Sequence, residues 1–175
     1  MKILLDETEL RQGVERLAER INEAYQGEPL TIIGVLTGSV ILLADLIRLM
    51  TMPLRVGVVQ ASSYRGGTTP GELVLNAELM PDIAGRHVLF VDDIFDTGRT
   101  LVQVVALARQ LGPRSVETAV LLRKTGKQEV DYRPRFVGFD IPDEFVVGYG
   151  LDYQDAYRNL NYVAALEAED LDQSH

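Results

Sequence analysis

Residues 88–101, VLFVDDIFDTGRTL, end an apolar run with three acids and a small polar loop. Asp92, Asp93 and Asp96 have no basic residue between them to balance their charge. At an effective dielectric constant of about 20, two like charges ~4 Å apart cost about 4 kcal/mol, so these acids need partners. Carboxylates accept hydrogen bonds from sugar hydroxyls and are hard oxygen ligands for divalent cations. The segment therefore predicts a site for hydroxyls or a metal ion.

The residues after the acids have the chemistry of an anion site. Thr97, Gly98, Arg99 and Thr100 supply backbone N–H groups and two hydroxyls just before an expected helix. Such groups at a helix N-terminus bind phosphate. Phosphate, hydroxyls and metal on one ligand indicate a phosphorylated sugar. The alternative interpretation is a buried strand that ends in a polar loop, with the loop capping a helix and the acids merely solvated.

Alternating strands and helices are expected to position this loop. Asp6 with Glu9 predicts a capped amphipathic helix that continues through Tyr25. Further helices are expected at 40–50 and 100–112, and strands or short apolar pieces at 30–36, 54–64, 72–79, 87–91, 115–122, 136–141 and 145–150. This order predicts an α/β fold with a mostly parallel central sheet flanked by helices, in a single domain over residues 1–175. Ligands of such sheets gather at the carboxyl ends of the strands.

Composition narrows the function classes. The 175 residues are 46% hydrophobic, which suffices for one sizeable core, and the net charge is −9. This charge disfavours binding to nucleic acid or to an anionic membrane. No apolar run reaches the ~20 residues that span a bilayer, and cysteine is absent, so we expect a cytoplasmic protein. With His87 and His175 as the only histidines, a zinc site or a Ser-His-Asp triad is disfavoured.

Residues 88–101 resemble the phosphoribosyl-diphosphate signature of type I phosphoribosyltransferases. LTGS at 36–39 resembles the family's pyrophosphate loop, and SSY with RGGTTPGELVL resembles its flexible lid. KT at 124–125, followed by FVGFDIPDEFVVGYGLDYQDAYRNL, is similar to the purine end of the hypoxanthine (hypoxanthine-guanine) branch. The resemblance implies the type I phosphoribosyltransferase fold, in which the chain termini form a small hood.

The resemblance also implies an activity, a cofactor and partners. A purine salvage enzyme of this kind transfers the 5-phosphoribosyl group from phosphoribosyl diphosphate to N9 of hypoxanthine and/or guanine. The products are IMP or GMP and pyrophosphate, the required cofactor is Mg²⁺, and the expected assembly is a homodimer or homotetramer.

Matching residues inherit roles from the resemblance. Phosphoribosyl diphosphate would be bound by Asp92, Asp93, Asp96, Thr97, Gly98, Arg99 and Thr100. Asp96 would also be the catalytic base at a purine ring nitrogen. Leu36, Thr37, Gly38 and Arg158 would contact pyrophosphate, with a cis peptide expected between Leu36 and Thr37. Thr37 stands where many relatives have Lys or Arg, so only its backbone role carries over.

The purine and the metal have their own implied residues. Lys124 would face the 6-oxo group, and because an ammonium only donates hydrogen bonds, a 6-amino purine is disfavoured. Phe145 would stack on the base, Val146 would offer backbone groups, and Asp152 would lie near the base's outer edge. The implied metal residues are Asp92, Asp93 and Asp152, and the lid begins at Ser63 and Tyr64. Each assignment has a plain structural alternative, such as a surface lysine for Lys124 or a core aromatic for Phe145.

Two other function classes remain for comparison. The first is an RNA-binding regulator similar to the pyrimidine-operon attenuators, which need a basic face that this acidic chain lacks in composition. The second is a phospho-acceptor domain, suggested by KILLDE before alternating strands and helices. It would need a phosphorylated aspartate near Asp6 and Glu7, for which the sequence offers no good candidate.

Overall fold

The computed structural model describes residues 1–63 and 73–171. The predicted lid residue Tyr64 therefore lies outside the described residues, while Ser63 is the last residue of a strand. In chain order the elements are β1 Lys2–Leu5, α1 Glu7–Tyr25, β2 Leu30–Leu36, α2 Val40–Ile47, β3 Leu54–Ser63, β4 Leu73–Asn76, β5 His87–Phe95, α3 Arg99–Arg109, β6 Ser115–Lys124, β7 Phe136–Ile141, β8 Val146–Val147, β9 Val163–Ala165 and α4 Ala168–Leu171.

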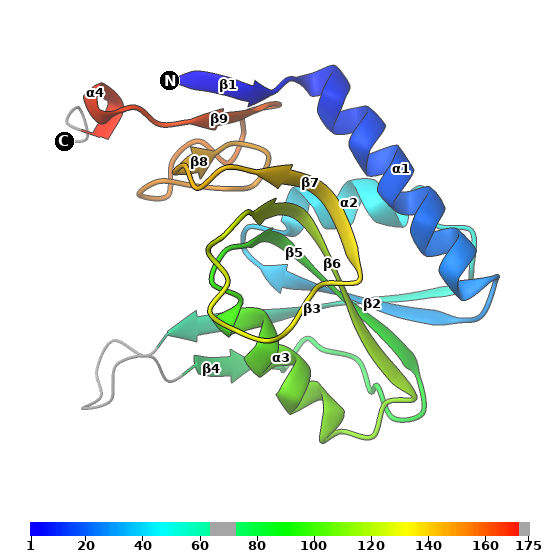
Figure 1. Cartoon of the computed structure of the whole chain (residues 1–175). Coiled ribbons are helices and arrows are strands. Elements are labelled where there is room, and N and C mark those ends of the chain that lie inside the picture. Colours follow the sequence, from blue (N-terminus) through cyan, green and yellow to red (C-terminus); the bar gives the residue numbers. More distant parts are fainter. Residues whose placement is uncertain (64–72, 172–175) are drawn as a thin grey trace, which may run out of the picture.

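The central sheet has six strands in the order β4-β3-β2-β5-β6-β7 (Figure 1). Neighbours pair in parallel, except that the edge strand β4 runs antiparallel to β3. From β2 the next strand along the chain, β3, is added on one side, whereas from β5 the next strand, β6, is added on the other side. The strand order therefore changes direction between β2 and β5. Loops at the carboxyl ends of such a pair leave a crevice for ligands. The mostly parallel sheet predicted from the sequence is confirmed.

Successive residues of β2 and β5 enter different cores. Ile32 and Leu89 pack in the core under α1 and α2, whereas Ile33 and Phe90 pack under α3 on the opposite face. Strand side chains alternate between faces, so a strand covered on both sides must be apolar throughout. The continuous apolar runs at 30–36 and 88–91 follow from this arrangement.

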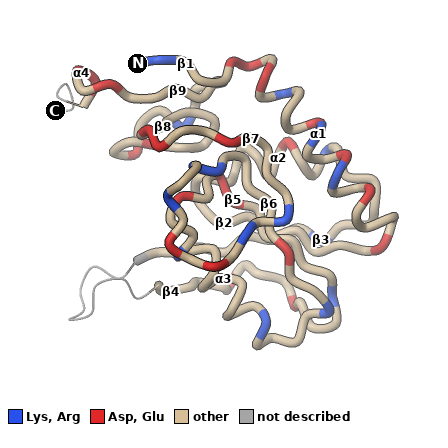
Figure 2. The backbone as a smooth tube through the Cα atoms, in the orientation of Figure 1, with Lys and Arg blue, Asp and Glu red and all other residues tan. Residues whose placement is uncertain are grey.

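Helix α1 has the predicted capping box. Asp6 Oδ1 accepts a hydrogen bond from Glu9 N at 2.8 Å, and Glu9 Oε2 accepts one from Asp6 N at 2.9 Å. Asp6 is therefore a helix cap rather than part of an acidic phosphorylation site. Lys and Arg alternate with Asp and Glu along this helix (Figure 2), as expected of a solvated outer face.

Two helices are shorter than predicted. Helix α2 ends at Ile47 rather than near residue 50, and α3 spans Arg99–Arg109 rather than 100–112. Conversely, β5 extends beyond the predicted 87–91, because Asp92 and Ile94 continue to pair with Val120 and Leu122 of β6. The first two acids therefore belong to a strand rather than a loop. No helix in the described ranges is long and apolar enough to cross a membrane.

A second, three-stranded sheet with order β1-β9-β8 joins the two ends of the described chain. Both of its pairings are antiparallel, and Figure 1 shows it above the carboxyl end of the central sheet. The terminal ammonium of Met1 lies 2.6 Å from Glu167 Oε2 and closes this hood further. The hood was expected, but β1 and β9 were not predicted as strands, because each is short and lacks alternation.

Candidate active site

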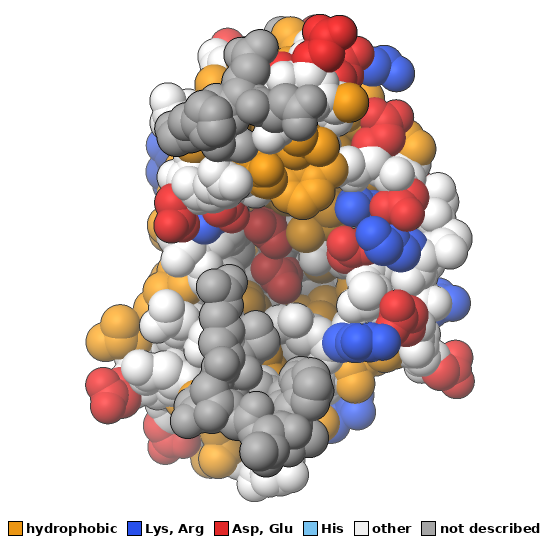
Figure 3. Space-filling model, turned by 90° about the vertical axis from the view of Figure 1, so that its left-hand side faces the viewer, with side chains coloured by type: hydrophobic (Ala, Val, Ile, Leu, Met, Phe, Trp, Pro, Cys, Tyr) orange, Lys and Arg blue, Asp and Glu red, His pale blue; other side chains and the backbone are white. Residues whose placement is uncertain are grey.

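A cavity of about 440 Å³ opens at the carboxyl ends of β2 and β5. It is lined by residues of three predicted groups: the acidic strand end and phosphate loop, the 36–38 loop, and the C-terminal segment with Asp152 and Arg158. In Figure 3 this side of the molecule is hollowed between the hood and the central sheet, with acidic side chains inside the hollow. The fold thus brings together groups that are up to about 120 positions apart in the sequence.

A second cavity, of about 570 Å³, lies between α1, α2 and the 158–161 segment. It shares Arg158 with the first cavity but is not lined by Asp92, Asp93, Asp96 or the phosphate-loop residues 97–100. The size of a cavity does not show whether it is an active site. We assign the candidate active site to the smaller cavity, because carboxylates and backbone N–H groups converge there.

Asp92 and Asp93 form a close, partly buried pair at the floor of this cavity. Asp92 Oδ1 accepts a hydrogen bond from Asp93 N at 2.9 Å, and Asp93 Oδ1 accepts one from Ile94 N at 2.7 Å. Burial, followed by the negative charge of Asp93, raises the pKa of Asp92 well above its ordinary value. Burial also raises the pKa of Asp93, although the pair's hydrogen bonds and Arg158 oppose this. A cation or hydroxyl donors would relieve both carboxylates.

The phosphate loop is shaped by Gly98. Its φ of +87° lies in the left-handed region, and a Cβ there would meet Val130 at 2.5 Å and Phe95 at 2.7 Å. This tight turn starts α3 at Arg99, so the first N–H groups of the helix have no intrahelical acceptor, and that of Arg99 donates to Thr97 Oγ1 at 3.3 Å. Thr97, Gly98 and Thr100 line the cavity. The Arg99 side chain does not, because it pairs with Glu129.

The 36–38 loop packs directly on the acids. The Leu36–Thr37 peptide is cis, as expected from the resemblance. Gly38 lies so close to Asp93 that a Cβ on Gly38 would be 1.8 Å from Asp93 Oδ2. Thr37 is exposed, and Leu36, Thr37 and Gly38 all line the cavity. The absence of a side chain at 38 is therefore required by the position of Asp93.

Lys124 lies beside the phosphate loop, at the end of β6. It is only 6% exposed, and its Nζ lies 3.4 Å from both Asp96 Oδ2 and Asp143 Oδ1. Lys127 Nζ completes the cluster, 3.1 Å from Asp143 and 3.5 Å from Asp96 Oδ1. Hydrogen bonding to Lys127, with a smaller contribution from Lys124, lowers the pKa of Asp143. Within the described residues, Asp96 Oδ1 is buried and receives no hydrogen bond.

Sequence reasoning missed part of this cluster. Asp143, Lys127 and Gln128 received no role, yet Gln128 donates hydrogen bonds to the backbone carbonyls of Lys124 and Asp96. Glu129 N also donates to Thr97 O at 2.9 Å, which fixes the 125–130 segment over the phosphate loop. The only sequence signal was a group of polar residues next to KT and FVV, which is also typical of an ordinary surface loop.

Two other predicted purine residues, Phe145 and Val146, lie at the start of the hood strand β8. Phe145 is 49% exposed and packs edge-on against Tyr153, with ring centroids 5.5 Å apart. Val146 is buried and pairs with Ala165 of β9 in the hood. Neither residue lines the 440 Å³ cavity. The structure therefore brings Lys124 to Asp96, but it does not bring Phe145 or Val146 to the wall of the phosphate cavity.

Asp152 and Arg158 form the outer wall. Arg158 Nη2 lies 2.9 Å from Asp152 Oδ1, and Arg158 Nη1 donates to Gly150 O at 2.8 Å. Across the described ranges, no three acidic, histidine or cysteine side chains converge as a ready-made metal cage. Asp92 and Asp93 nevertheless fit a hard divalent cation, because Mg²⁺ commonly takes one or two carboxylates and completes its shell with substrate oxygens and water.

The fold and cavity define an α/β protein with an anion-binding loop and a carboxylate pair at the carboxyl ends of its parallel strands. Residues 1–154 match the model of the phosphoribosyl transferase domain family. The chain belongs to this family.

Known relatives agree with this assignment. The chain is 40% identical over 168 residues to the hypoxanthine-guanine phosphoribosyltransferase of Staphylococcus epidermidis, an alignment that covers 95% of this chain and 94% of the relative. A Bacillus anthracis hypoxanthine-guanine phosphoribosyltransferase superposes with a TM-score of 0.90 at 36% identity, covering 95% of this chain and 99% of the other. For a ternary substrates complex of Trypanosoma cruzi hypoxanthine phosphoribosyltransferase, the TM-score is 0.91 at 37% identity, with 98% and 97% covered.

Proposed function

We propose that this chain transfers the 5-phosphoribosyl group of phosphoribosyl diphosphate to N9 of hypoxanthine and/or guanine, with release of pyrophosphate. Relatives described above are named hypoxanthine-guanine phosphoribosyltransferases, which supports this class of reaction. The observation that most supports it is that Asp96 lines the phosphate cavity while its carboxylate contacts the buried Lys124. A proton acceptor and a donor for the 6-oxo group thus lie side by side at the edge of the phosphate loop.

The base is selected by donors and acceptors. Lys124 donates to the 6-oxo oxygen, whereas a 6-amino group would place donor against donor. Asp96 Oδ1, which accepts no hydrogen bond from the described residues, takes the proton of a purine ring nitrogen as N9 bonds to the ribose. The ring of Phe145 offers an exposed face for stacking, and the Val146 backbone contacts the base edge.

The phosphoribosyl group is held from three sides. Asp92 and Asp93 accept hydrogen bonds from the ribose hydroxyls, which relieves the mutual repulsion of these acids. Backbone N–H groups of residues 97–100 and the hydroxyls of Thr97 and Thr100 hold the 5'-phosphate. Arg158 and the backbone of Leu36, Thr37 and Gly38 hold the pyrophosphate that leaves.

Mg²⁺ would be held by Asp92 and Asp93, with Asp152 in the wall of the same cavity. When bound it supplies positive charge that neutralises the pyrophosphate. The lid expected from the resemblance, beginning at Ser63 and Tyr64, would exclude water from a reacting ribose with oxocarbenium character; Tyr64 lies outside the described residues. The proposal also includes one functional domain over residues 1–175, a homodimer or homotetramer, and a cytoplasmic location.

An ultraviolet assay of base conversion tests this function. The protein is incubated with phosphoribosyl diphosphate, Mg²⁺ and one of hypoxanthine, guanine, xanthine, adenine or uracil. Turnover of a 6-oxopurine, without turnover of adenine, is the expected result. If no base reacts although phosphoribosyl diphosphate still binds in calorimetry, the chain is a sensor or regulator rather than a transferase.

A further inference from the structure

Tyr149 connects the C-terminal segment to the helix that follows the 36–38 loop. Its side chain is buried, and its hydroxyl donates a hydrogen bond to Asp45 Oδ2 on α2, 104 positions away. Arg48 Nη2 lies 2.5 Å from the other carboxylate oxygen of Asp45. Burial, together with the hydrogen bond to Asp45, raises the pKa of the Tyr149 hydroxyl, so the group stays protonated and donates at neutral pH.

The backbone around Tyr149 touches both halves of the pyrophosphate site. Gly148, Tyr149 and Gly150 have φ values of 96°, 51° and 100°, and a Cβ on Gly150 would lie 2.2 Å from Gly38 O. Gly150 N donates to Arg158 O at 3.0 Å, and Gly150 O accepts from Arg158 Nη1 at 2.8 Å. A shift of residues 148–150 would therefore move Arg158 and release the packing on Gly38 at the same time.

Neither Tyr149 nor Asp45 lines the phosphate cavity. Both line the second cavity, together with Arg158. A non-glycine residue in the left-handed region is disfavoured unless its surroundings hold it there. For Tyr149, those surroundings are the hydroxyl contact with Asp45 at one end and the backbone bond from Tyr149 N to Leu160 O, at 2.9 Å, at the other.

We propose that Tyr149 and Asp45 are positioning residues, whose hydrogen bond holds Arg158 and the Gly38 backbone in the relative placement that binds pyrophosphate. This inference rests on the proposed function, because it names further residues of the same site. The hydrogen bond therefore supports binding of the pyrophosphate group, both as part of phosphoribosyl diphosphate and after it has left. It does not act on the base, whose contacts come from β6 and the 143–146 segment.

The test uses variants that remove or keep this hydrogen bond, and both Asp45 variants also remove the charge that pairs with Arg48. Tyr149→Phe removes the hydroxyl, Asp45→Ala removes the acceptor, and Asp45→Asn keeps an acceptor oxygen and serves as the conservative rescue. Tyr132→Phe is the matched control, because it removes a partly buried hydroxyl that bonds with Thr118 Oγ1 at 2.9 Å. Pyrophosphate binding is measured by calorimetry in Mg²⁺, and KM is measured separately for phosphoribosyl diphosphate and for hypoxanthine.

We expect Tyr149→Phe and Asp45→Ala each to raise the Kd for pyrophosphate and the KM for phosphoribosyl diphosphate roughly tenfold, which equals about 1.4 kcal/mol. The KM for hypoxanthine should stay within about twofold of the wild-type value. The double variant should lose no more affinity for pyrophosphate than either single variant. Asp45→Asn should retain near-normal binding, and Tyr132→Phe should lower only the Tm.

Each other outcome overturns the inference. Unchanged pyrophosphate affinity in Tyr149→Phe, with a Tm loss like that of Tyr132→Phe, would make the contact purely structural. Equal increases in both KM values would mean a general disturbance of the site. Wild-type protein that binds neither pyrophosphate nor phosphoribosyl diphosphate would overturn the proposed function and this inference with it, whereas normal wild-type binding with unaffected variants overturns the inference alone.

Discussion

The Lys124 ammonium lies 3.4 Å from the Asp96 carboxylate, although 28 positions separate the two residues in the chain. β5 and β6 pair in parallel, and both residues lie just where these neighbouring strands end. The contact joins the phosphate loop to the lysine that we assign to the base. The Asp96 carboxylate therefore lies next to both the phosphate loop and the lysine that we assign to the base.

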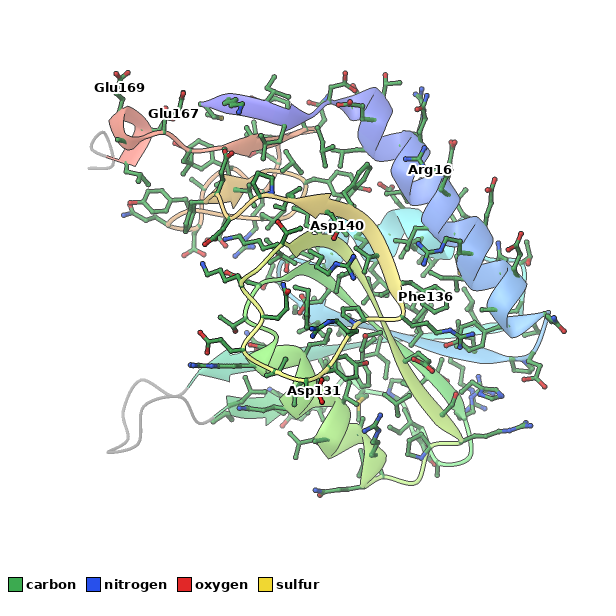
Figure 4. All side chains as sticks on the ribbon, viewed as in Figure 1. Arg16, Asp131, Phe136, Asp140, Glu167 and Glu169 are labelled. Atoms are coloured by element: carbon green, nitrogen blue, oxygen red, sulfur yellow. The ribbon has the colours of Figure 1, made fainter. Side chains whose placement is uncertain are left out.

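Replacing Asp96 with Asn should separate catalysis from stability. The amide has a similar shape but cannot take a proton at neutral pH, and a positioned base contributes about 10²–10⁴ in rate. We expect kcat to fall by a factor in that range, with little change in Tm. Steady-state rates and calorimetry measure the two quantities. The control is Asp131→Asn, at an exposed residue of the segment between β6 and β7 (Figure 4), which should leave both unchanged.

Lys124→Gln should weaken discrimination between bases. The glutamine amide both donates and accepts hydrogen bonds, so a 6-amino group is no longer opposed by donors alone. We expect the preference for hypoxanthine over adenine in kcat/KM to fall about tenfold or more. The control is Arg123→Gln, because Arg123 forms its ion pair with Asp140, labelled on β7 in Figure 4. An unchanged preference in Lys124→Gln would remove Lys124 from base selection.

Gly38→Ala should damage ligand binding rather than the fold. The new Cβ would lie 1.8 Å from Asp93 Oδ2, so the carboxylate or the loop must move. Displacement of site groups by about 1 Å can reduce rates roughly 10²-fold, and we expect a loss of kcat/KM of that order. Gly112→Ala is the comparison. Its φ is +73° with nothing within 4 Å, so it should cost about 1–2 kcal/mol of stability and leave the kinetics intact.

Asp92→Asn should stabilise the free protein while abolishing activity. Burial and Asp93 raise the pKa of Asp92 in the folded state, so folding favours its protonated form. The contribution of Asp92 to stability is thus fully present below its unfolded pKa of about 3.9 and is lost as pH rises through the raised value. At pH 7 the amide avoids the free-energy cost of burying a charged carboxylate beside Asp93. It also keeps the oxygen that accepts a hydrogen bond from Asp93 N.

The measurement is the Tm of Asp92→Asn and of wild type in EDTA, between pH 4 and pH 8. Each kcal/mol gained raises the Tm by roughly 2–4 °C in a chain of this size. The advantage of the variant should be present at pH 7 and shrink towards pH 4. Asp82→Asn is the control, because Asp82 Oδ1 also accepts a backbone N–H, from Ala84 at 3.0 Å, but is exposed. A lower Tm for Asp92→Asn at pH 7 contradicts the reasoning.

The local elements followed from local sequence. The capping box of Asp6 and Glu9 fixed the start of α1, and the apolar run at 30–36 became β2 within the same bounds. The type and spacing of Asp92, Asp93, Asp96 and residues 97–100 also indicated phosphate and cation chemistry. These features depend on neighbours in the chain, through backbone hydrogen bonds and side-chain periodicity.

Other features depend on residues that are distant in the chain. The sequence assigned a role to Lys124 by resemblance alone, and nothing in it indicated that Asp143 and Lys127 would share the charge cluster with Lys124 and Asp96. Tyr149 and Asp45 likewise gave no signal, because each is ordinary in its own segment. Only the pairing of β5 with β6, and the packing of residues 148–150 on Gly38, placed these groups within hydrogen-bonding distance. Contacts of this kind are set by the packing of the whole fold, which local periodicity does not encode.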